Sequence, residues 1–240
     1  MLNKKTTFQR ARGDINVKIK SNEINRFYQS GSAKVFYPKS SQKFKELVLV
    51  NTAGGITSGD NFSYDFEIVN KSKIFLTTQT AERAYKGFNE KAKIKISLTV
   101  DETSNLFWIP QELILFNNCN FDRNIEVNLS QNSNFILAET TIFGRTAMGE
   151  YLEKGYFNDN WRINVNKNLI HAEALNLNGN IKETLSNIAS AKDGVAISNI
   201  FIYGKKLLSY ENILPEILKN SGTVLLLSLI HISEPTRPNE

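Results

Sequence analysis

The sequence has 240 residues, and 41% of them are hydrophobic, which is sufficient for a substantial core in one large domain or two small ones. Its 29 basic and 24 acidic residues are interspersed, so the net charge of +5 gives weak support to a nucleic-acid-binding protein. The single cysteine, Cys119, excludes an internal disulfide and favours a reducing compartment. Because the sequence has no signal-peptide pattern and no run of about eighteen apolar residues, we expect a cytoplasmic protein without a membrane span.

Short apolar or alternating runs dominate the chain up to about residue 140 and predict many strands. The runs cover residues 15–19, 33–37, 46–50, 62–68, 73–79, 93–100, 105–110, 113–116, 121–129 and 134–138. A later run, Val195–Tyr203, is also apolar, uncharged and strongly β-prone. Turn-forming residues between the runs indicate an all-β sandwich, barrel or solenoid. No strict repeat period is visible, which argues against a regular solenoid.

Helical patterns occur only late in the chain, at residues 182–191 and 211–219. No linker rich in Gly, Ser or Pro divides the sequence, so we predict a single, mainly β domain over residues 1–228, with a few helices towards the C-terminus. The final segment, Leu229–Glu240, contains the breaker-rich sequence Ser-Glu-Pro-Thr-Arg-Pro. We expect this atypical tail to lie outside the native fold.

A glycine-rich stretch, Asn51–Asp60, joins two of the predicted strands. Its three glycines permit positive φ angles and a close approach of other groups. It is not a phosphate-binding P-loop, because Asp60 stands where that motif needs lysine and a strand follows rather than a helix. The dinucleotide fingerprint Gly-x-Gly-x-x-Gly does not fit either. The local chemistry favours a strand-to-strand turn.

Candidate metal ligands are mostly carboxylates. The chain has two histidines, His171 and His231, and no cluster of Cys and His at the spacing of a zinc site. Carboxylates stand at predicted strand and turn ends, at Asp60, Glu112, Glu139 and Glu150. Each could simply be solvated or hydrogen-bonded. Together, some of them could line an internal polar passage in which oxygen ligands hold a divalent ion weakly.

Two further polar features have both structural and functional interpretations. Arg145 could pair with Glu139 or Glu150 in a structural role, or it could contact a ligand. The run Thr77-Thr78-Gln79 offers hydroxyls and an amide at a strand end, where cross-strand hydrogen bonds are the simpler role.

Four segments occur in a characteristic order: Asn51–Asp60, Leu76–Ala81, Trp108–Glu112 and Gly144–Glu150. Together with Arg12-Gly13, and over a region that extends to about Ile163, they resemble the family of urease accessory proteins called UreD, or UreH in some organisms. The positions that carry the resemblance are Asn51, Gly54, Gly55, Gly59, Thr77, Thr78, Gln79, Pro110, Gln111, Glu112, Gly144, Arg145 and Gly149. The resemblance implies an irregular β-helical architecture.

The same resemblance implies a non-enzymatic urease maturation chaperone that bridges apo-urease, UreF and the GTPase UreG in a hetero-oligomer. It implies a transient passage of nickel without a permanently bound cofactor, and no nucleic-acid or membrane partner. Asp60, Glu139 and Glu150 are our candidate nickel contacts. One departure is Glu82-Arg83: familiar members have a small residue or threonine before the basic residue, so Glu82 adds a negative charge there.

A carbohydrate-active enzyme on an irregular β-scaffold is the alternative. It would need two carboxyl groups converging in an open cleft as acid and base, beside exposed aromatic platforms. Trp108 and Trp161 could be such platforms, although a buried core position is the commoner role for tryptophan. Nucleic-acid binding ranks last, since the sequence has no basic and aromatic stripe.

Overall fold

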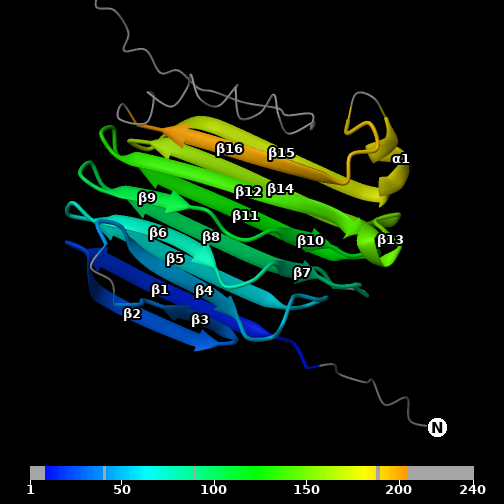
Figure 1. Ribbon diagram of the computed structural model, residues 1–240, viewed down its shortest axis with the longest axis horizontal. Helices are drawn as coiled ribbons and strands as arrows, with labels where there is room; N and C mark the ends of the chain where they lie inside the picture. The colour runs from blue at the N-terminus through cyan, green and yellow to red at the C-terminus, as the bar shows by residue number, and fades with distance from the viewer. Residues whose placement is uncertain (1–8, 40–41, 89, 188–189, 205–240) are drawn as a thin grey trace, which may run out of the picture.

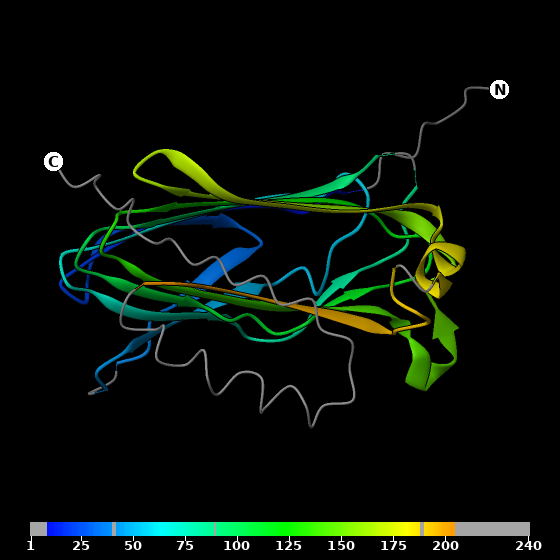
Figure 2. The ribbon, with the colours of Figure 1, turned by 90° about the horizontal axis from the view of Figure 1, so that it is seen from above.

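The computed structural model describes residues 9–39, 42–88, 90–187 and 190–204, and these residues form two β-sheets that face each other (Figures 1 and 2). The seven-stranded sheet contains β1 (Arg12–Lys20), β2 (Glu23–Gly31), β5 (Asn61–Val69), β8 (Ala92–Val100), β11 (Asn120–Leu129), β14 (Lys154–Val165) and β15 (Asn168–Asn180). The nine-stranded sheet contains β3 (Ala33–Phe36), β4 (Lys45–Asn51), β6 (Lys73–Thr78), β7 (Glu82–Ala84), β9 (Asn105–Trp108), β10 (Leu113–Leu115), β12 (Asn134–Arg145), β13 (Glu150–Tyr151) and β16 (Ala196–Tyr203). A 3-10 turn, η1 (Thr146–Met148), and one helix, α1 (Ile181–Ser186), lie at one end.

The chain winds between the sheets as an irregular solenoid. Strands β1, β5, β8, β11 and β14 pair in parallel in one sheet, and β4, β6, β9 and β12 do so in the other. Along one row of the first sheet, Arg12 pairs with Asn61, Asn61 with Lys93, Lys93 with Asp122, and Asp122 with Asn158. The successive coils therefore differ in length, which is why the sequence shows no repeat period. The prediction of a mainly β, irregular β-helical fold is confirmed.

The core lies between the sheets and is built from alternating side chains. In β5, Phe62, Tyr64, Phe66 and Ile68 are buried, while the residues between them face outward. The same alternation in β8 buries five apolar side chains along nine residues. Each inward-facing row of side chains stacks on the corresponding row of the next coil. The predicted strands are confirmed, with boundary shifts of a few residues.

Three predictions are corrected. Residues 105–110 form a strand only to Trp108, and the run at 134–138 continues to Arg145, so that Glu139 lies within a strand instead of ending one. The helix expected at 182–191 is α1 alone. Its N-terminus is capped by the side chain of Asn180, and it ends where Asn187 adopts an extended conformation. The region at 211–219 and the tail lie outside the described residues.

The hairpin of β14 and β15 was not expected. Its second strand places His171 and Glu173 at inward-facing positions, so the sequence lacks the clean apolar alternation of the earlier strands. The β-prone run Val195–Tyr203 becomes β16, which pairs with β12 in antiparallel fashion. Strand β15 lies in the seven-stranded sheet and β16 in the nine-stranded sheet, so the two are in opposite layers (Figure 2).

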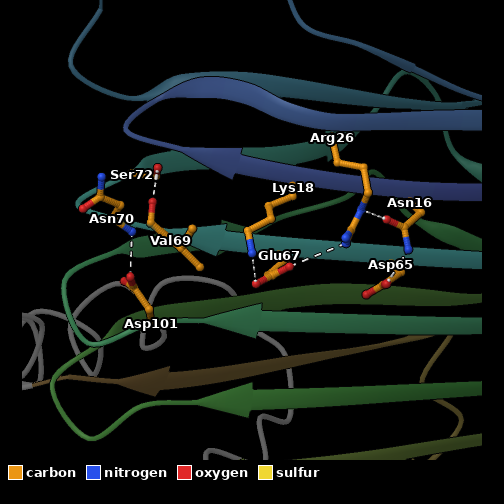
Figure 3. A network of polar contacts seen from close by, with 9 residues as sticks. All are labelled: Asn16, Lys18, Arg26, Asp65, Glu67, Val69, Asn70, Ser72 and Asp101. Atoms are coloured by element: carbon orange, nitrogen blue, oxygen red, sulfur yellow. Dashed lines mark hydrogen bonds and ion pairs between the residues drawn. The ribbon is translucent and has the colours of Figure 1, made fainter.

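Polar side chains join neighbouring coils on the outside of the seven-stranded sheet (Figure 3). Lys18 Nζ lies 2.6 Å from Glu67 Oε1, and Arg26 contacts the other oxygen of Glu67 at 3.5 Å. At the turn end of the same coils, the Asn70 amide donates to Asp101 Oδ2 at 2.6 Å. Such exposed pairs align the coils but contribute little to the free energy of folding.

No helix within the described ranges is long and apolar enough to cross a lipid bilayer.

Replacement of Gly13 by alanine should destabilise the fold. A Cβ atom at Gly13 would lie 2.5 Å from Ala33 Cβ, 2.6 Å from the Ala33 amide nitrogen and 2.8 Å from Phe62 Cδ1. Since two coils must separate to accept it, we expect Gly13→Ala to lose about 1–3 kcal/mol of unfolding free energy. The neighbouring exposed change, Asp14→Ala, should stay within about 0.5 kcal/mol. Urea denaturation measures both, and equal stabilities would contradict the packing described here.

Candidate functional site

The nine-stranded sheet is interrupted near its middle. Strand β12 pairs with β9 at residues 134–137 and with β10 at residues 141–143, so residues 138–140 pair with neither. Ile109–Glu112 lies opposite this interval and belongs to no strand. Pro110 suits the position, because proline has no amide hydrogen to offer to a ladder. The segment Trp108–Glu112, singled out from the sequence, thus marks a break in the wall of the solenoid.

Cavities lie on both sides of this break. The inner cavity has a volume of about 50 Å³ and the outer one about 260 Å³. They share four lining residues, Pro110, Gln111, Glu139 and Thr140. The Gln111 backbone amide donates to Thr78 Oγ1 at 2.9 Å, which fixes the inner rim and leaves the Gln111 side chain at the opening.

A second opening lies at the glycine-rich turn. A cavity of about 30 Å³ there is lined by Asn51, Gly54, Gly55 and Gln79, among other residues. It shares Leu49, Tyr64, Thr78 and Glu82 with the inner cavity. The same interior space is therefore bordered by Asn51–Asp60 and Leu76–Ala81, although both segments are distant in the sequence from the break at Ile109–Glu112.

Glu82 and Tyr64 meet in that space. Burial raises the pKa of Glu82 to about 7, although hydrogen bonds from the Asn51 side chain and the Arg83 backbone act in the opposite direction. Asn51 Nδ2 lies 3.2 Å from each oxygen of the Glu82 carboxylate. The Tyr64 hydroxyl is buried and has no hydrogen-bond partner among the described residues. Burial and the nearby Glu82 charge raise its pKa well above 10.

A buried ion cluster stands at the inner end of the space. Arg123 of β11 donates to Asp159 of β14 through Nε at 2.9 Å and through Nη2 at 2.6 Å. The same Nη2 lies 2.6 Å from Glu139 Oε2, which comes from the facing sheet. Burial and the Asp159 charge raise the pKa of Glu139, while Arg123 and the Trp108 indole lower it, and burial is the largest of these effects. The cluster therefore joins the two sheets by charge.

Two tryptophans complete the cluster. Trp108 Nε1 donates to Glu139 Oε1 at 2.6 Å, and Trp161 Nε1 donates to Asp159 Oδ2 at 3.0 Å. Both rings are buried, with 2% and 3% of their surface exposed. They cannot act as exposed platforms for a sugar, and both carboxylates are held by the arginine between them. The geometry thus gives no support to the carbohydrate-active alternative.

Further polar contacts lie beyond the ion cluster, between β15 and β16. Asn199 of β16 donates to Glu173 Oε1 of β15 at 2.9 Å, and His171 Nε2 lies 3.6 Å from Glu173 Oε2. Burial raises the pKa of Glu173 and the charge of Asp159 acts in the same direction, whereas His171 opposes the shift. Polar groups therefore extend from the glycine-rich turn, past Arg123, to the pair β15 and β16.

The three predicted nickel contacts are not gathered into one site. Both carboxylate oxygens of Asp60 accept backbone amides, from Ala11 at 2.7 Å and from Thr57 at 2.8 Å. Glu150 accepts the Asn117 amide at 3.0 Å and pairs with Arg145 through Nε at 2.6 Å. Among the described residues, no group of three or more His, Cys, Asp or Glu side chains is placed to hold a metal ion. Contact of each carboxylate with a passing ion stays a prediction.

The structural role considered for Arg145, a pair with Glu150, is confirmed. Its guanidinium also lies over the ring of Phe116, 4.3 Å from the centroid, and Phe116 meets Tyr85 edge-on at 4.9 Å. Tyr85 in turn packs against Gly55, where a Cβ atom would lie 2.4 Å from its ring. Through this aromatic contact, the glycine-rich turn and the segment Gly144–Glu150 come together at one end of the solenoid.

The glycines of these segments allow backbone conformations that other residues rarely adopt. Four of them have left-handed φ angles, Gly54 at 78°, Gly59 at 79°, Gly144 at 83° and Gly149 at 73°. Gly149 ends the 3-10 turn η1 by donating its amide to the carbonyl of Thr146 at 3.0 Å. Side chains would be strained there, so these positions shape the rims without supplying chemistry.

Sequence reasoning missed Arg123 and Asp159, although a signal was present. In Phe121-Asp122-Arg123-Asn124-Ile125, alternation assigns Arg123 to the same face as the two apolar residues. Asp159 likewise alternates with Phe157 and Trp161. A charged residue within an apolar row predicts a buried ion pair, because an unpaired charge is costly in the interior.

Comparisons with known proteins agree with the motif resemblance. A family model described as UreD urease accessory protein matches residues 9–230. A Urease accessory protein UreD of Rhodopseudomonas palustris (strain HaA2) is 40% identical over 177 residues, which are 74% of this chain and 63% of that protein. A Urease accessory protein UreD of Mesorhizobium japonicum is 34% identical over 199 residues, 83% of this chain and 71% of that protein. The match thus spans less than two thirds of the length of the Rhodopseudomonas relative.

Stability should depend on pH through Glu82. Its pKa is raised from an ordinary 4.5 to about 7 in the folded state, so between these pH values the unfolded chain ionises first. Unfolding free energy should therefore fall as pH rises through this window, by up to about 3 kcal/mol. Glu82→Gln should remove that loss and be the more stable protein above pH 7, with no difference below pH 4.5. Thermal unfolding across the window tests this, and identical pH profiles would contradict it.

Proposed function

The chain belongs to the family of UreD urease accessory proteins, and from that premise we propose that it is a urease maturation chaperone through which Ni²⁺ reaches apo-urease. Its relatives are named accessory proteins rather than enzymes, in agreement with the non-enzymatic prediction. We propose that it works in the cytoplasm, in a hetero-oligomer with UreF, UreG and apo-urease. Nickel is the cargo here and not a resident cofactor.

The observation that carries the proposal is an inner cavity with two openings, in which a few polar groups lie among apolar side chains. One opening lies at Asn51–Gly55 and the other at the break beside Pro110 and Gln111. Between them lie Glu82, the Tyr64 hydroxyl and Glu139. These carboxylate and hydroxyl oxygens offer a hard divalent ion ligands that the apolar side chains around them, such as Ile94 and Phe121, do not.

The arrangement supports transfer rather than storage. Tight divalent sites gather several charged ligands around one point, and the described residues contain no such group. The two carboxylates that line the route, Glu82 and Glu139, each already have a protein partner. An ion could thus exchange partners one at a time without being held at any of them.

Closing the break should stop maturation without removing the fold. Gln111→Trp fills the opening shared by the inner and outer cavities, whereas Glu126→Trp adds the same ring to the outer face of the other sheet. In cells that carry a urease operon lacking its own UreD, the native chain and Glu126→Trp should restore urease activity and its nickel content. Gln111→Trp should leave both at the level measured without the chain, while still co-purifying with UreF. Full activation by Gln111→Trp would contradict this route, and failure of the native chain would contradict the proposed function itself.

Nickel should bind the isolated chain weakly and through oxygen. Cys119 is buried, with 1% of its surface exposed, and burial raises the pKa of its thiol to about 12, which disfavours the thiolate that metals bind. X-ray absorption of the nickel-loaded chain should show a first shell of oxygen and nitrogen, unchanged in Cys119→Ser. A sulfur-dominated shell that disappears in the variant would contradict this expectation.

A further inference from the structure

We propose that Arg123 is a resident counter-cation that prevents the interior of this protein from retaining divalent metal ions. The inference rests on the proposed function, because it concerns the same polar interior. It assigns to one side chain the task of keeping a carboxylate-bearing interior from becoming a metal trap.

The guanidinium occupies the point at which two carboxylates from facing sheets converge. Asp159 Oδ2 and Glu139 Oε2 each lie 2.6 Å from the same nitrogen atom, Nη2. A metal ion at that nitrogen's position could therefore be reached by both oxygens after a small relaxation. Arg123 is itself buried, with 7% of its surface exposed, and it lines the inner cavity together with Glu139.

Each carboxylate oxygen of the pair already faces a donor. Asp159 Oδ1 faces Arg123 Nε, and Oδ2 faces both Nη2 and the Trp161 indole. Glu139 Oε1 accepts the Trp108 indole, and Oε2 forms an ion pair with Nη2 but accepts no hydrogen bond from the described residues. An arriving ion must therefore displace the arginine before it can bind either carboxylate in a chelating manner.

Charge explains why the arginine matters. With both carboxylates ionised, the cluster carries one positive and two negative charges. Without the arginine, the two buried negative charges would attract a divalent ion with little screening, because charges interact far more strongly in the interior than in water. The ion would neutralise the two carboxylates and would dissociate slowly. A permanently charged arginine prevents this, since the guanidinium stays protonated in proteins.

A purely structural brace between the sheets is the competing explanation. It predicts that loss of Arg123 lowers stability and that Ni²⁺ makes no difference. If Arg123 acts as a counter-cation, its loss creates a site for Ni²⁺. The metal then stabilises the variant, because it binds only the folded state. The response to metal separates the two explanations.

The test compares Arg123→Met with two controls in the full chain. Arg26→Met removes an arginine that also contacts a carboxylate, but at the exposed surface (Figure 3). The triple variant Arg123→Met, Glu139→Gln, Asp159→Asn removes the whole ion cluster. Each protein is exposed to NiCl₂ and desalted. Retained nickel is measured by mass spectrometry, and melting temperature is measured with and without NiCl₂.

We expect Arg123→Met to retain about one Ni²⁺ per chain, with an apparent Kd at least about tenfold lower than that of the native chain. Its melting temperature should rise with NiCl₂. The native chain, Arg26→Met and the triple variant should show neither effect. A folded Arg123→Met that responds to nickel no more than the native chain would overturn the proposal.

Arg123→Met can also fail to fold in metal-free buffer, because it leaves two buried carboxylates unpaired. Expression and purification in NiCl₂ should then recover the folded chain with bound metal. If it stays unfolded with nickel while the triple variant folds, the proposal is overturned. These measurements need no urease, so they separate this inference from the proposed function: nickel retention by Arg123→Met can be found even where the native chain does not activate urease.

Discussion

Charge inside a β-solenoid has to be paired, and the pairing of Arg123 with Asp159 and Glu139 fixes how the two sheets of this protein face each other. Asp159 is the neighbour of Arg123 across a parallel pair in one sheet, and Glu139 reaches the same guanidinium from the other sheet. A shift of one sheet against the other by one residue would leave Arg123 paired with Asp159 but would move Glu139 away from the guanidinium, so that its buried carboxylate loses this partner. Apolar rows alone are less selective, because neighbouring Ile, Leu and Phe side chains can exchange contacts at a small cost.

The interruption of the nine-stranded sheet follows from the same arrangement. Strand β12 changes partner from β9 to β10 where Glu139 turns inward, and the connection between those two strands contains Pro110. A continuous ladder there would have closed the wall over the ion cluster. The segments that carry the family resemblance thus form rims and turns, whereas the charged groups of the interior lie on strands, mostly outside those segments.

Much of the fold could be predicted from the sequence, since apolar and alternating runs identified ten strands in the first two thirds of the chain, although β2 and β7 were not among them. What could not be predicted was which coils lie together. Arg123 and Asp159 are 36 residues apart, and Asn16 and Asp65 are 49 apart, so no common period relates one coil to the next. The hairpin of β14 and β15 was missed because Glu173 and His171 interrupt its apolar face. Of the candidate nickel contacts, Asp60 accepts the Ala11 amide from 49 residues away, and Glu150 accepts the Asn117 amide from 33 residues away. These distant partners could not be read from the sequence, whereas the local pair of Glu150 with Arg145 could.

The proposed nickel route would have to both attract a cation and release it, which is a conflict. Carboxylates provide attraction, and our inference is that two of them converging in the interior without a counter-cation would retain a divalent ion. This chain meets the conflict in two different ways. Glu82 is partly buried, which makes its charge costly, and it accepts hydrogen bonds from the neutral side-chain amide of Asn51. Glu139 and Asp159 converge, but a permanent cation lies between them. In both places the oxygen atoms remain while the net negative charge is reduced, and under the proposed function an ion could then pass them without being retained.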